Sequence, residues 1–301
     1  MEIDWNYSIM LKREEIQIRD PYILVHDGMY YLYGTTDKNC WGDKGTGFDS
    51  YKSKDLENWE GPFTAFRPSK DFWADRHFWA PEVYFYNGRF YMFASFKSPS
   101  RSRATQILVS DSPDGVFEPL TGSPITPDGW ECLDGTMYIE DGEPWMIFCR
   151  EWTEVIDGEM YAVRLKKDLT GTEGEPILLF RSSQASWTVG AKQTVNGKEC
   201  LAYVTDGPNL YKTEDNNLLM LWSCGGKKGY AIGLAKSSNG KINGEWTHFD
   251  KCLFEENGGH GMIFEALDGK KYVTLHKPNK TPNERTCFFE VKEVNGTLEL
   301  A

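Results

Sequence analysis

The stretch Ile18-Arg19-Asp20-Pro21-Tyr22-Ile23, followed by residues 27–35 (Asp-Gly-Met-Tyr-Tyr-Leu-Tyr-Gly-Thr), sets the pattern for the whole chain. An Asp-Pro pair opens a strand rich in aromatic and β-branched residues, and an Asp-Gly turn leads into a second strand. Asp-Gly favours a type I′ turn, because both central residues of that turn need a positive φ. Pro21 fixes its own φ and biases Asp20 toward an extended backbone. The stretch therefore predicts a β-hairpin that begins at an oriented carboxylate.

The same turn-and-strand signal recurs along the chain. Later copies are Asn87-Gly88 before residues 89–94, Asp141-Gly142 before 143–148, Asp215-Asn216-Asn217 before 218–222, and Asp268-Gly269 before 270–275. A third short β run follows each hairpin, at residues 48–52, 106–110, 161–165, 230–234 and 287–291. The repeat of roughly 55 to 70 residues suits four strands plus loops. With almost no helical periodicity and no linker, the sequence predicts an all-β fold, a single five-bladed β-propeller over residues 1–301. A β-sandwich with several hairpins is the alternative.

Composition narrows the classes of partner. The formal net charge of −12 argues against nucleic-acid binding, because a phosphate backbone needs a basic face. Aromatic residues make up 14% of the chain, enough for a large core and an aromatic-lined cleft that would suit a neutral sugar. No run of about 18 apolar residues occurs, so no membrane span is expected. The oligomeric state is left open.

The N-terminus and the cysteines bear on the compartment. The start, Met1-Glu2-Ile3-Asp4-Trp5, lacks a basic segment followed by an apolar one, so no secretion signal is visible. Seven cysteines are scattered without paired spacing, which predicts reduced and mostly buried thiols. We therefore expect a cytoplasmic protein, with a secreted protein whose leader has been removed as the alternative.

In a propeller, the innermost strands begin at the central channel, so the residues ahead of each hairpin should converge there. They are Asp20, Glu82 in Trp79-Ala80-Pro81-Glu82, Asp134, Asp206 in Asp206-Gly207-Pro208, and His260. Four of the five units thus place a carboxylate at the channel, and the fifth places a histidine. Carboxylates gathered around one axis should separate each other's pKa values, which is how acid and base roles are divided.

These motifs in this order resemble glycoside hydrolase family 43, whose members are five-bladed propeller glycosidases, and the resemblance runs from about Ile18 to Phe289. It implies one-step hydrolysis with inversion, acting mostly on α-L-arabinofuranosides and β-D-xylosides of plant polysaccharides. It also implies that Asp20 is the general base, that Asp134 tunes and orients the acid, and that Asp206 is the general acid. The family normally has Glu at that last place, so Asp206, one methylene shorter, must approach the glycosidic oxygen more closely.

Two further carboxylates compete for the acid role. Glu151 directly follows the second strand of the third unit, and Glu82 follows Trp79-Ala80-Pro81. Each has an alternative interpretation, a hydrogen bond to a sugar hydroxyl or to the backbone of a neighbouring strand. Arg19 would keep Asp20 ionised if its guanidinium lay near that carboxylate, but alternation along a strand predicts that Arg19 points elsewhere.

The resemblance also suggests residues that contact the sugar or an ion. His260 corresponds to a histidine near the propeller axis that often contacts a hydrated calcium or other ion. Imidazole is a poor calcium ligand, so a water-mediated contact or a purely structural role is expected, and no cofactor is required. Arg285 matches an arginine that binds sugar hydroxyls in relatives, although a surface salt bridge is equally compatible with the sequence. His276 is expected to be a pocket-wall or core residue.

Aromatic residues divide into a sugar wall and packing residues. Trp73 and Trp152 lie in loops beside predicted channel strands, where a ring can pack on the C–H face of a sugar, and Trp79 opens such a strand. Trp41, Trp59, Trp145, Trp222 and Trp246 are assigned to packing between blades.

The function expected from these features is an inverting glycosidase that removes pentose residues, most of all α-L-arabinofuranosyl residues. The alternatives within the family are a β-xylosidase and an endo-arabinanase. Exo action is favoured, because loops at residues 38–47 and 69–77 would rim a pocket, with Trp73 and Trp152 closing it. A catalytically impaired carbohydrate-binding propeller is made credible by Asp at position 206. A protein-interaction propeller is less consistent with four channel carboxylates, since scaffold propellers recruit partners on broad faces.

Overall fold

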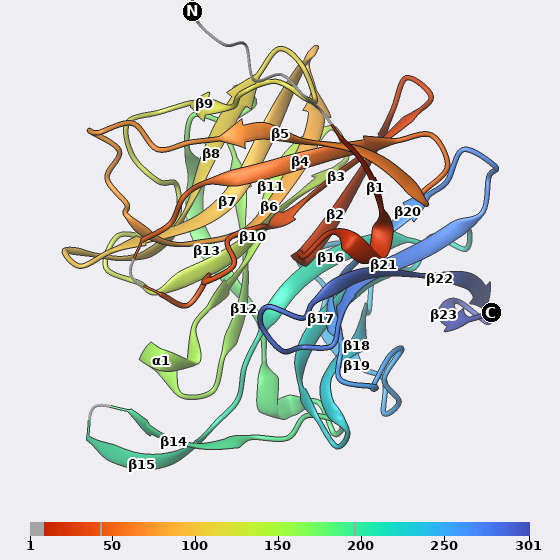
Figure 1. Cartoon of the computed structure of the whole chain (residues 1–301). Coiled ribbons are helices and arrows are strands. Elements are labelled where there is room, and N and C mark those ends of the chain that lie inside the picture. Colours follow the sequence, from red (N-terminus) through yellow and green to blue (C-terminus); the bar gives the residue numbers. More distant parts are fainter. Residues whose placement is uncertain (1–8, 43, 196) are drawn as a thin grey trace, which may run out of the picture.

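The chain forms five β-sheets around a common axis, each built from consecutive strands (Figure 1). The computed structural model describes residues 9–42, 44–195 and 197–301. Within each sheet, neighbouring strands are antiparallel. The prediction of a five-bladed β-propeller is therefore confirmed.

The strands of the blades have the following bounds. The first blade contains β1 (Ile9–Lys12), β2 (Arg19–His26), β3 (Met29–Thr35), β4 (Phe48–Ser53) and β5 (Asn58–Phe66), with β1 added outside β5. The second contains β6 (Arg76–Tyr86), β7 (Arg89–Ser98), β8 (Arg101–Ser110) and β9 (Glu118–Pro119). The third contains β10 (Cys132–Glu140), β11 (Glu143–Arg150), β12 (Glu159–Leu165) and β13 (Thr172–Arg181). The fourth contains β16 (Asp206–Lys212), β17 (Leu218–Gly226), β18 (Gly229–Ser237) and β19 (Trp246–His248). The fifth contains β20 (Gly259–Glu265), β21 (Lys271–Lys277), β22 (Arg285–Val294) and β23 (Thr297–Leu300).

Few elements lie outside the blades. Two short 3-10 helices, η1 (Arg13–Glu15) and η2 (Ser182–Gln184), and one helix, α1 (Trp152–Val155), occur in connections. No helix among the described residues is long and apolar enough to cross a membrane. A separate two-stranded sheet, β14 (Ala191–Val195) and β15 (Lys198–Ala202), extends as an arm from the connection between the third and fourth blades (Figure 1). This arm was not predicted, although its sequence contains an Asn-Gly pair at residues 196–197.

The predicted hairpins join the first two strands of every blade. In the first blade, His26 pairs with Met29 across the turn, and Asp27 and Gly28 have φ values of 47° and 72°. The turns at Asn87-Gly88 and Asp141-Gly142 likewise have a positive φ at both residues. These three turns have the φ signs that type I′ requires, which is why the Asp-Gly and Asn-Gly pairs located them correctly.

Aromatic side chains fill the space inside and between the blades. Trp59 and Trp222 are fully buried, and Trp145 and Trp246 pack against the core of blades three and four. Burying a large apolar side chain contributes roughly 1.5 to 3 kcal/mol relative to leaving it exposed, so these residues stabilise the contacts between neighbouring sheets. The packing role predicted for Trp41 is wrong, because 55% of Trp41 is exposed. The cysteine prediction is confirmed: all seven are free, and four of them are buried.

The innermost strands form a closed ring. Strand β2 contacts β6 and β20, β10 contacts β6 and β16, and β16 contacts β20. The first and last blades meet through Arg19, whose Nη1 lies 2.6 Å from Oε1 of the fully buried Glu284. The backbone N–H of Ile18 also donates to the carbonyl of Glu284. The ring therefore closes directly beside Asp20.

Candidate active site

Every innermost strand has a β-bulge near its first residues. The pairing register with the second strand breaks after Arg19, Trp79, Leu133, Asp206 and Gly259. The residue that follows each of them has a positive φ: Asp20 (53°), Ala80 (47°), Asp134 (54°), Gly207 (51°) and His260 (51°). A bulge leaves its extra residue outside the ladder and bends the strand, so two consecutive side chains can face the same side.

The bulges correct three details of the sequence interpretation. Asp20 is not extended, because it occupies the left-handed position of a bulge, a region that Asp, Asn and His tolerate better than most residues. Arg19 does not point away from Asp20, since alternation fails at the bulge and both residues line one pocket. Asp206 corresponds to Arg19 rather than to Asp20, while Glu82 lies two residues beyond the bulge position.

In most blades, the backbone N–H of the bulge residue donates a hydrogen bond to a side chain at an equivalent position. In four blades, the N–H of the bulge residue donates to a side chain on the second strand of the preceding blade. These bonds are Ala80 to Thr35 (2.8 Å), Asp134 to Ser95 (2.9 Å), His260 to Ser223 (2.9 Å) and Asp20 to His276 Nδ1 (3.1 Å). Each of these four innermost strands is thereby bonded to the second strand of the preceding blade at the level of the site, which holds its bulge in position.

The fourth blade is the exception. The residue equivalent to the four acceptors is Cys149, which pairs with Leu133 in the register. The N–H of Gly207 donates instead to Oδ2 of Asp134, at 2.9 Å. This bond links Asp134, which is predicted to tune the acid, to the backbone next to Asp206, the predicted general acid.

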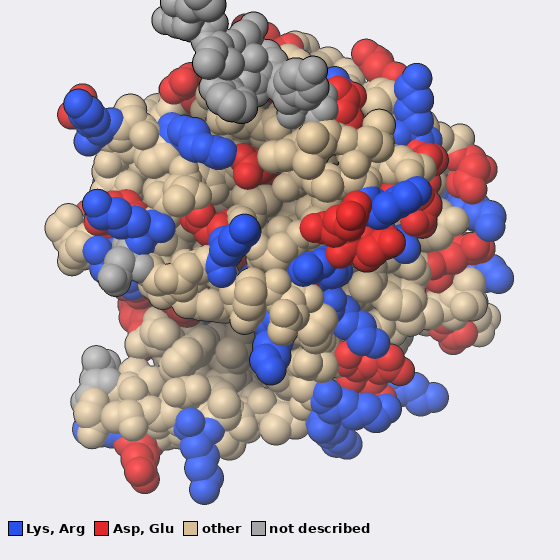
Figure 2. All heavy atoms as spheres, in the orientation of Figure 1, with Lys and Arg blue, Asp and Glu red and all other residues tan. Residues whose placement is uncertain are grey.

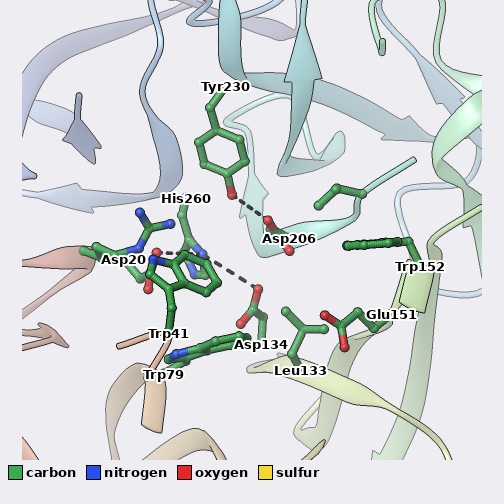
Figure 3. A pocket seen from close by; sticks show the side chains of 12 residues that line it. Asp20, Trp41, Trp79, Leu133, Asp134, Glu151, Trp152, Asp206, Tyr230 and His260 are labelled. Carbon is green, nitrogen blue, oxygen red and sulfur yellow. Dashed lines mark hydrogen bonds and ion pairs between the residues drawn. The ribbon is translucent and has the colours of Figure 1, made fainter. Parts of the chain in front are cut away.

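The bulges surround a pocket of about 240 Å³. Asp20, Asp134 and Asp206 all line it, so the structure brings together the three predicted catalytic residues (Figure 3). The remaining lining residues are Arg19, Trp41, Trp79, Leu133, Glu151, Trp152, Val204, Tyr230 and His260. The volume is below the range of about 300 to 1,000 Å³ that is usual for ligand pockets, which suits one small ring better than a run of sugars.

Asp20 is held as an anion. Its Oδ2 accepts from Thr35 Oγ1 at 2.7 Å, and its Oδ1 lies 3.3 Å from Nδ1 of His260. Burial alone would raise the pKa of this carboxyl, but His260, Arg19, His276 and the Thr35 hydroxyl outweigh it and lower the pKa to about 2. A carboxylate that stays ionised at neutral pH is what a general base requires.

Asp134 and Asp206 are shifted the other way. Burial, followed by the charge of Asp20, raises the pKa of Asp134 to about 8. Burial, followed by the charge of Asp134, raises the pKa of Asp206 to about 7. Two adjacent carboxyls of this kind titrate jointly, so near neutral pH the pair retains a proton while Asp20 does not. The pocket thus contains both a proton acceptor and a proton donor.

The competing carboxylates lie in different surroundings. Glu151 lines the pocket, but its Oε2 accepts from Arg103 Nη1 and, at 2.9 Å, from Thr153 Oγ1. A carboxylate paired with a buried guanidinium suits a fixed anion rather than a proton donor. Glu82 does not line the pocket; its Oε2 accepts from the hydroxyls of Tyr84 and, at 2.6 Å, Thr136.

Besides Glu82, two other predicted sugar contacts lie away from the pocket. Trp73 packs against Phe72 and Phe96 and donates through Nε1 to Gln106, at 3.1 Å. Arg285 donates to three backbone carbonyls, those of Glu14, Pro282 and Glu284. Neither residue lines the pocket, so neither is positioned to bind a sugar there.

The aromatic wall consists of Trp41, Trp79 and Trp152. Trp41 meets Trp79 edge to face, with ring centroids 4.9 Å apart, and Trp79 stacks on the ring of His77 at 4.7 Å. Trp41 Nε1 donates to Thr281 Oγ1 at 3.0 Å, and Trp79 Nε1 donates to the carbonyl of Cys40 at 2.7 Å. Their polar atoms are therefore engaged, which leaves apolar ring surface for a sugar.

The two histidines near Asp20 differ. His276 is fully buried, and burial, reinforced by the Arg19 charge, lowers its pKa to about 3. Neutral His276 accepts the Asp20 N–H through Nδ1, so it is a core residue that supports the bulge. His260 lies between two carboxylates, 3.3 Å from Asp20 Oδ1 and 3.7 Å from Asp134 Oδ2.

The side chains around His260 do not form a direct ion site. Among the described residues, no group of three or more His, Cys, Asp or Glu side chains is arranged to hold a metal ion. The Nδ1 of His260 is already directed at the two carboxylates. The donor set therefore does not fit a directly bound calcium.

Several pocket residues were missed by the sequence interpretation. Tyr230, which lies on the third strand of its blade, donates through its hydroxyl to Asp206 Oδ2 at 2.9 Å. Leu133 and Val204 line the pocket next to predicted site residues. The sequence signal for Leu133 was its place directly before Asp134, but no local pattern marks a third-strand tyrosine as a pocket residue.

Charged side chains are unevenly distributed over the face of the molecule seen in Figure 2. Figure 2 shows a hollow between the arm of β14 and β15 and the rest of the molecule, and the side chains visible around it are mostly uncharged. Charged side chains of both signs gather instead on the other side of this view, over the region of the fifth blade.

A comparison with known families agrees with this geometry. The model for glycosyl hydrolases family 43 matches residues 15–295. The chain belongs to glycosyl hydrolase family 43. The family resemblance expected from the Asp-Pro, Trp-Ala-Pro-Glu, Asp-Gly-Pro and Gly-His-Gly motifs is therefore confirmed.

The chain is also similar to individual proteins. A crystal structure described as an endo-arabinase from Bacteroides thetaiotaomicron is 43% identical, with a TM-score of 0.86, and the match covers 95% of this chain and 98% of that one. Extracellular exo-α-(1→5)-L-arabinofuranosidases from Cellvibrio japonicus and Streptomyces avermitilis are 27% and 24% identical, over 54% and 90% of this chain. The matched regions span 48% and 59% of the lengths of these two relatives.

Proposed function

We propose that the protein is an inverting glycoside hydrolase that removes single α-L-arabinofuranosyl residues from plant oligosaccharides or polysaccharides. The observation that carries the proposal is the division of roles among three buried carboxyls in one pocket. Asp20 has a lowered pKa, whereas Asp134 and Asp206 have raised ones. An inverting glycosidase needs this combination, because one carboxylate activates water while a second carboxyl protonates the leaving oxygen.

Asp20 acts as the general base in this proposal. A water bound near the carboxylate loses a proton to it as the water oxygen attacks the anomeric carbon, opposite the leaving group. His260 and Thr35 hold the two carboxylate oxygens, which fixes the direction in which the proton is accepted. In the proposed single displacement, the proton acceptor and the proton donor are both carboxyl groups of this chain.

Asp206 acts as the general acid, and Asp134 sets its protonation and its position. The Asp206 proton moves to the glycosidic oxygen as the bond between that oxygen and the anomeric carbon breaks. Asp134 and Asp206 titrate jointly, so the pair retains a proton near neutral pH, and the bond from the Gly207 N–H to Asp134 fixes the backbone beside Asp206. Glu151 is a candidate for a hydrogen bond to a sugar hydroxyl, because its carboxylate is anchored by Arg103 at the pocket wall.

The size and lining of the pocket support exo action on a neutral pentose. Trp41 and Trp79 close one side, Trp152 lies on another, and the volume is about 240 Å³. Two curated relatives are described as exo-arabinofuranosidases, whereas the Bacteroides structure is described as an endo-arabinase. We favour exo action, because an endo enzyme needs a groove that admits a chain on both sides of the cleaved bond.

The compartment we propose is extracellular. Both exo-arabinofuranosidases are described as extracellular, which does not support the cytoplasmic expectation and fits the alternative of a secreted protein. A polymer too large to enter a cell also has to be cut outside it.

The test is a panel of nitrophenyl pentosides combined with proton NMR of the first-formed sugar. We expect hydrolysis of the α-L-arabinofuranoside above that of the β-D-xyloside, release of the monosaccharide from arabinan, and an inverted anomer. Asp20→Asn should abolish each of these activities. Binding of arabino-oligosaccharides without hydrolysis would instead identify a carbohydrate-binding propeller, and release of internal fragments from arabinan would identify an endo enzyme.

A further inference from the structure

The predicted acid Asp206 is held by a residue from another strand. Tyr230, at the start of β18, donates its hydroxyl proton to Asp206 Oδ2 over 2.9 Å (Figure 3). Both side chains line the pocket. We propose that Tyr230 is the positioning residue for Asp206, which occupies Oδ2 so that Oδ1 carries the transferable proton toward the glycosidic oxygen. This inference rests on the proposed function of Asp206 as general acid.

The tyrosine ring occupies a slot that is built for it. A Cβ atom on Gly259 would lie 2.5 Å from both Cδ1 and Cε1 of Tyr230, so only glycine at that position leaves room for the ring. The ring also stacks on His276, with centroids 5.7 Å apart and planes 20° apart. The residue on which the ring stacks, His276, is fully buried and also accepts the Asp20 N–H, so one side chain supports both the Tyr230 ring and the bulge of the predicted base.

Asp206 needs this support more than a longer acid would. Its backbone is fixed on one side by the bond between the Gly207 N–H and Asp134, but its carboxyl can still rotate about two side-chain torsions. A single hydrogen bond to Oδ2 restricts both torsions at once. The shorter side chain cannot adjust its reach toward the glycosidic oxygen, so orientation decides whether the proton can be transferred.

The hydroxyl also responds to the charge that forms during the reaction. When the Oδ1 proton leaves, the carboxyl becomes a carboxylate, and a hydrogen bond to a charged acceptor is stronger than one to a neutral acceptor. Tyr230 therefore stabilises the transition state more than the ground state, which raises kcat rather than lowering KM. The other groups that face Asp206 are Asp134, Asp20, His260 and the thiols of Cys149 and Cys224.

The experiment is Tyr230→Phe, which keeps the ring in its slot and removes only the hydroxyl. On an arabinoside with a sugar leaving group we expect kcat to fall by about 10- to 100-fold, with KM changed by less than about twofold. Activity on the dinitrophenyl arabinoside, whose leaving group needs no proton, should be nearly unchanged. The alkaline limb of the kcat profile should move to higher pH, because the lost hydrogen bond had favoured the carboxylate form of Asp206.

Two further variants keep the result unambiguous. Tyr211→Phe is the matched control, because Tyr211 also donates to a carboxylate, that of Glu293, outside the pocket; it should leave activity unchanged. Gly259→Ala should reproduce the loss seen in Tyr230→Phe by displacing the ring, and adding it to Tyr230→Phe should bring little further loss. If Tyr230→Phe misfolds, Gly259→Ala alone carries the same expectations.

The outcomes separate this inference from the function on which it rests. Equal losses on the two substrates, or an unmoved alkaline limb in Tyr230→Phe, would overturn the positioning role of Tyr230. Full activity in Asp206→Ala on the sugar leaving group would overturn the proposed acid itself. If Asp206→Ala is inactive while Tyr230→Phe behaves like the wild type, only the positioning role is wrong.

Discussion

The backbone N–H of Gly207 donates a hydrogen bond to Oδ2 of Asp134 over 2.9 Å, and this bond has no counterpart in the other four blades. Elsewhere in the ring, the equivalent amide is bound by a threonine, a serine or a histidine of the preceding blade. In the third blade that acceptor position is occupied by Cys149, whose sulfur is a weak acceptor. Because Cys149 stands where the other blades have a stronger acceptor, the Gly207 N–H is free to bond to Asp134.

The bond from the Gly207 N–H affects both the pKa and the position of Asp134. A backbone amide favours the charged form of the carboxylate that accepts it, so the bond opposes the burial that raises the pKa of Asp134. It also fixes Asp134 against the residue that follows Asp206. The weak acceptor at position 149 is therefore part of the arrangement that couples the two carboxyls.

The first prediction concerns Cys149→Ser. The serine hydroxyl is a better acceptor in nearly the same volume, so it should capture the Gly207 amide as Ser95 and Ser223 capture theirs. Asp134 would then lose its bond, and its pKa and that of Asp206 would change together. We expect a fall in kcat of roughly 10-fold, with KM little changed, in steady-state assays on an arabinoside.

Cys200→Ser serves as the control for that substitution. Cys200 lies on the arm, outside the pocket, so the same chemical change there should leave kcat unaffected. A Cys149→Ser variant with wild-type kcat and an unchanged pH profile would mean that the exchange of acceptor does not affect catalysis.

The second prediction concerns the base. Asp20→Ala should lower kcat by several orders of magnitude with little change in KM, because activating the water matters only in the transition state. Activity should be measured on an activated aryl arabinoside, with circular dichroism to verify folding. Retention of more than about a tenth of the wild-type rate would remove Asp20 from the mechanism, since loss of a general base typically costs at least 100-fold.

The third prediction concerns pH. Asp206 must be protonated to act, and burial together with the Asp134 charge raises its pKa to about 7. The rate should therefore fall as the pH rises through about 7. Asp20 must be ionised, and its pKa of about 2 places the acidic limb well below pH 4. A profile of kcat/KM measures both limbs in the free enzyme; a rate that rises between pH 7 and 9 would contradict the acid assignment.

The repeat could be read from the sequence because each hairpin turn is a local signal. Asp27-Gly28 and its equivalents need positive φ values, and the residues that supply them are few. The identity of the site followed from the same repeat, since innermost strands converge at the axis. The sequence alone therefore predicts that Asp20, Asp134 and Asp206 converge at one pocket.

What the sequence did not reveal depends on departures from ideal strands. The bulges turn two consecutive residues toward the axis, so Arg19 lies beside Asp20 although alternation would separate them. Trp41 reaches the pocket from a loop, and Tyr230 reaches it from the third strand of its blade, so neither follows the pattern of the channel strands. Trp73 was misplaced for the opposite reason: an aromatic residue in a loop near the channel packs into the core instead.

The fourth prediction concerns the stability of the pocket wall. Arg103 is 3% exposed; it binds Glu151 through Nη1 and His77 Nδ1 through Nη2 at 2.8 Å, and it lies 4.0 Å above the ring of Trp79. Arg103→Met would leave the Glu151 charge buried without its partner, which typically costs about 3 to 5 kcal/mol. Urea unfolding should show this loss. Arg89→Met, which breaks an exposed pair with Asp111, should cost only about 0 to 1 kcal/mol.

One outcome would contradict the stabilising role of the pair between Arg103 and Glu151. If Arg103→Met lowers the free energy of unfolding no more than Arg89→Met does, the buried pair does not hold the wall of the pocket. A variant that is destabilised but keeps wild-type KM would separate the structural role of the pair from any contact between Glu151 and the sugar.

The last prediction rests on Asp206, an aspartate at the position where the family resemblance implies a glutamate. If Asp206 is the general acid, its loss should harm substrates in proportion to their need for protonation. Dinitrophenolate leaves without a proton, whereas a sugar alkoxide does not. Asp206→Ala should therefore lose about 100-fold or more activity on a natural arabinoside and much less on the dinitrophenyl glycoside.

Asp206→Glu tests the same role by lengthening the side chain while keeping its carboxyl group. It restores the carboxyl length that the family resemblance implies but adds a methylene inside the pocket, next to the Tyr230 hydroxyl. We expect measurable activity, below that of the wild type, with the preference for leaving groups preserved. Equal losses of Asp206→Ala on both substrates would mean that the residue positions the sugar. Glu151→Ala would then be the variant to assay on the same two substrates. Besides Asp20, Asp134 and Asp206, Glu151 is the carboxylate that lines the pocket.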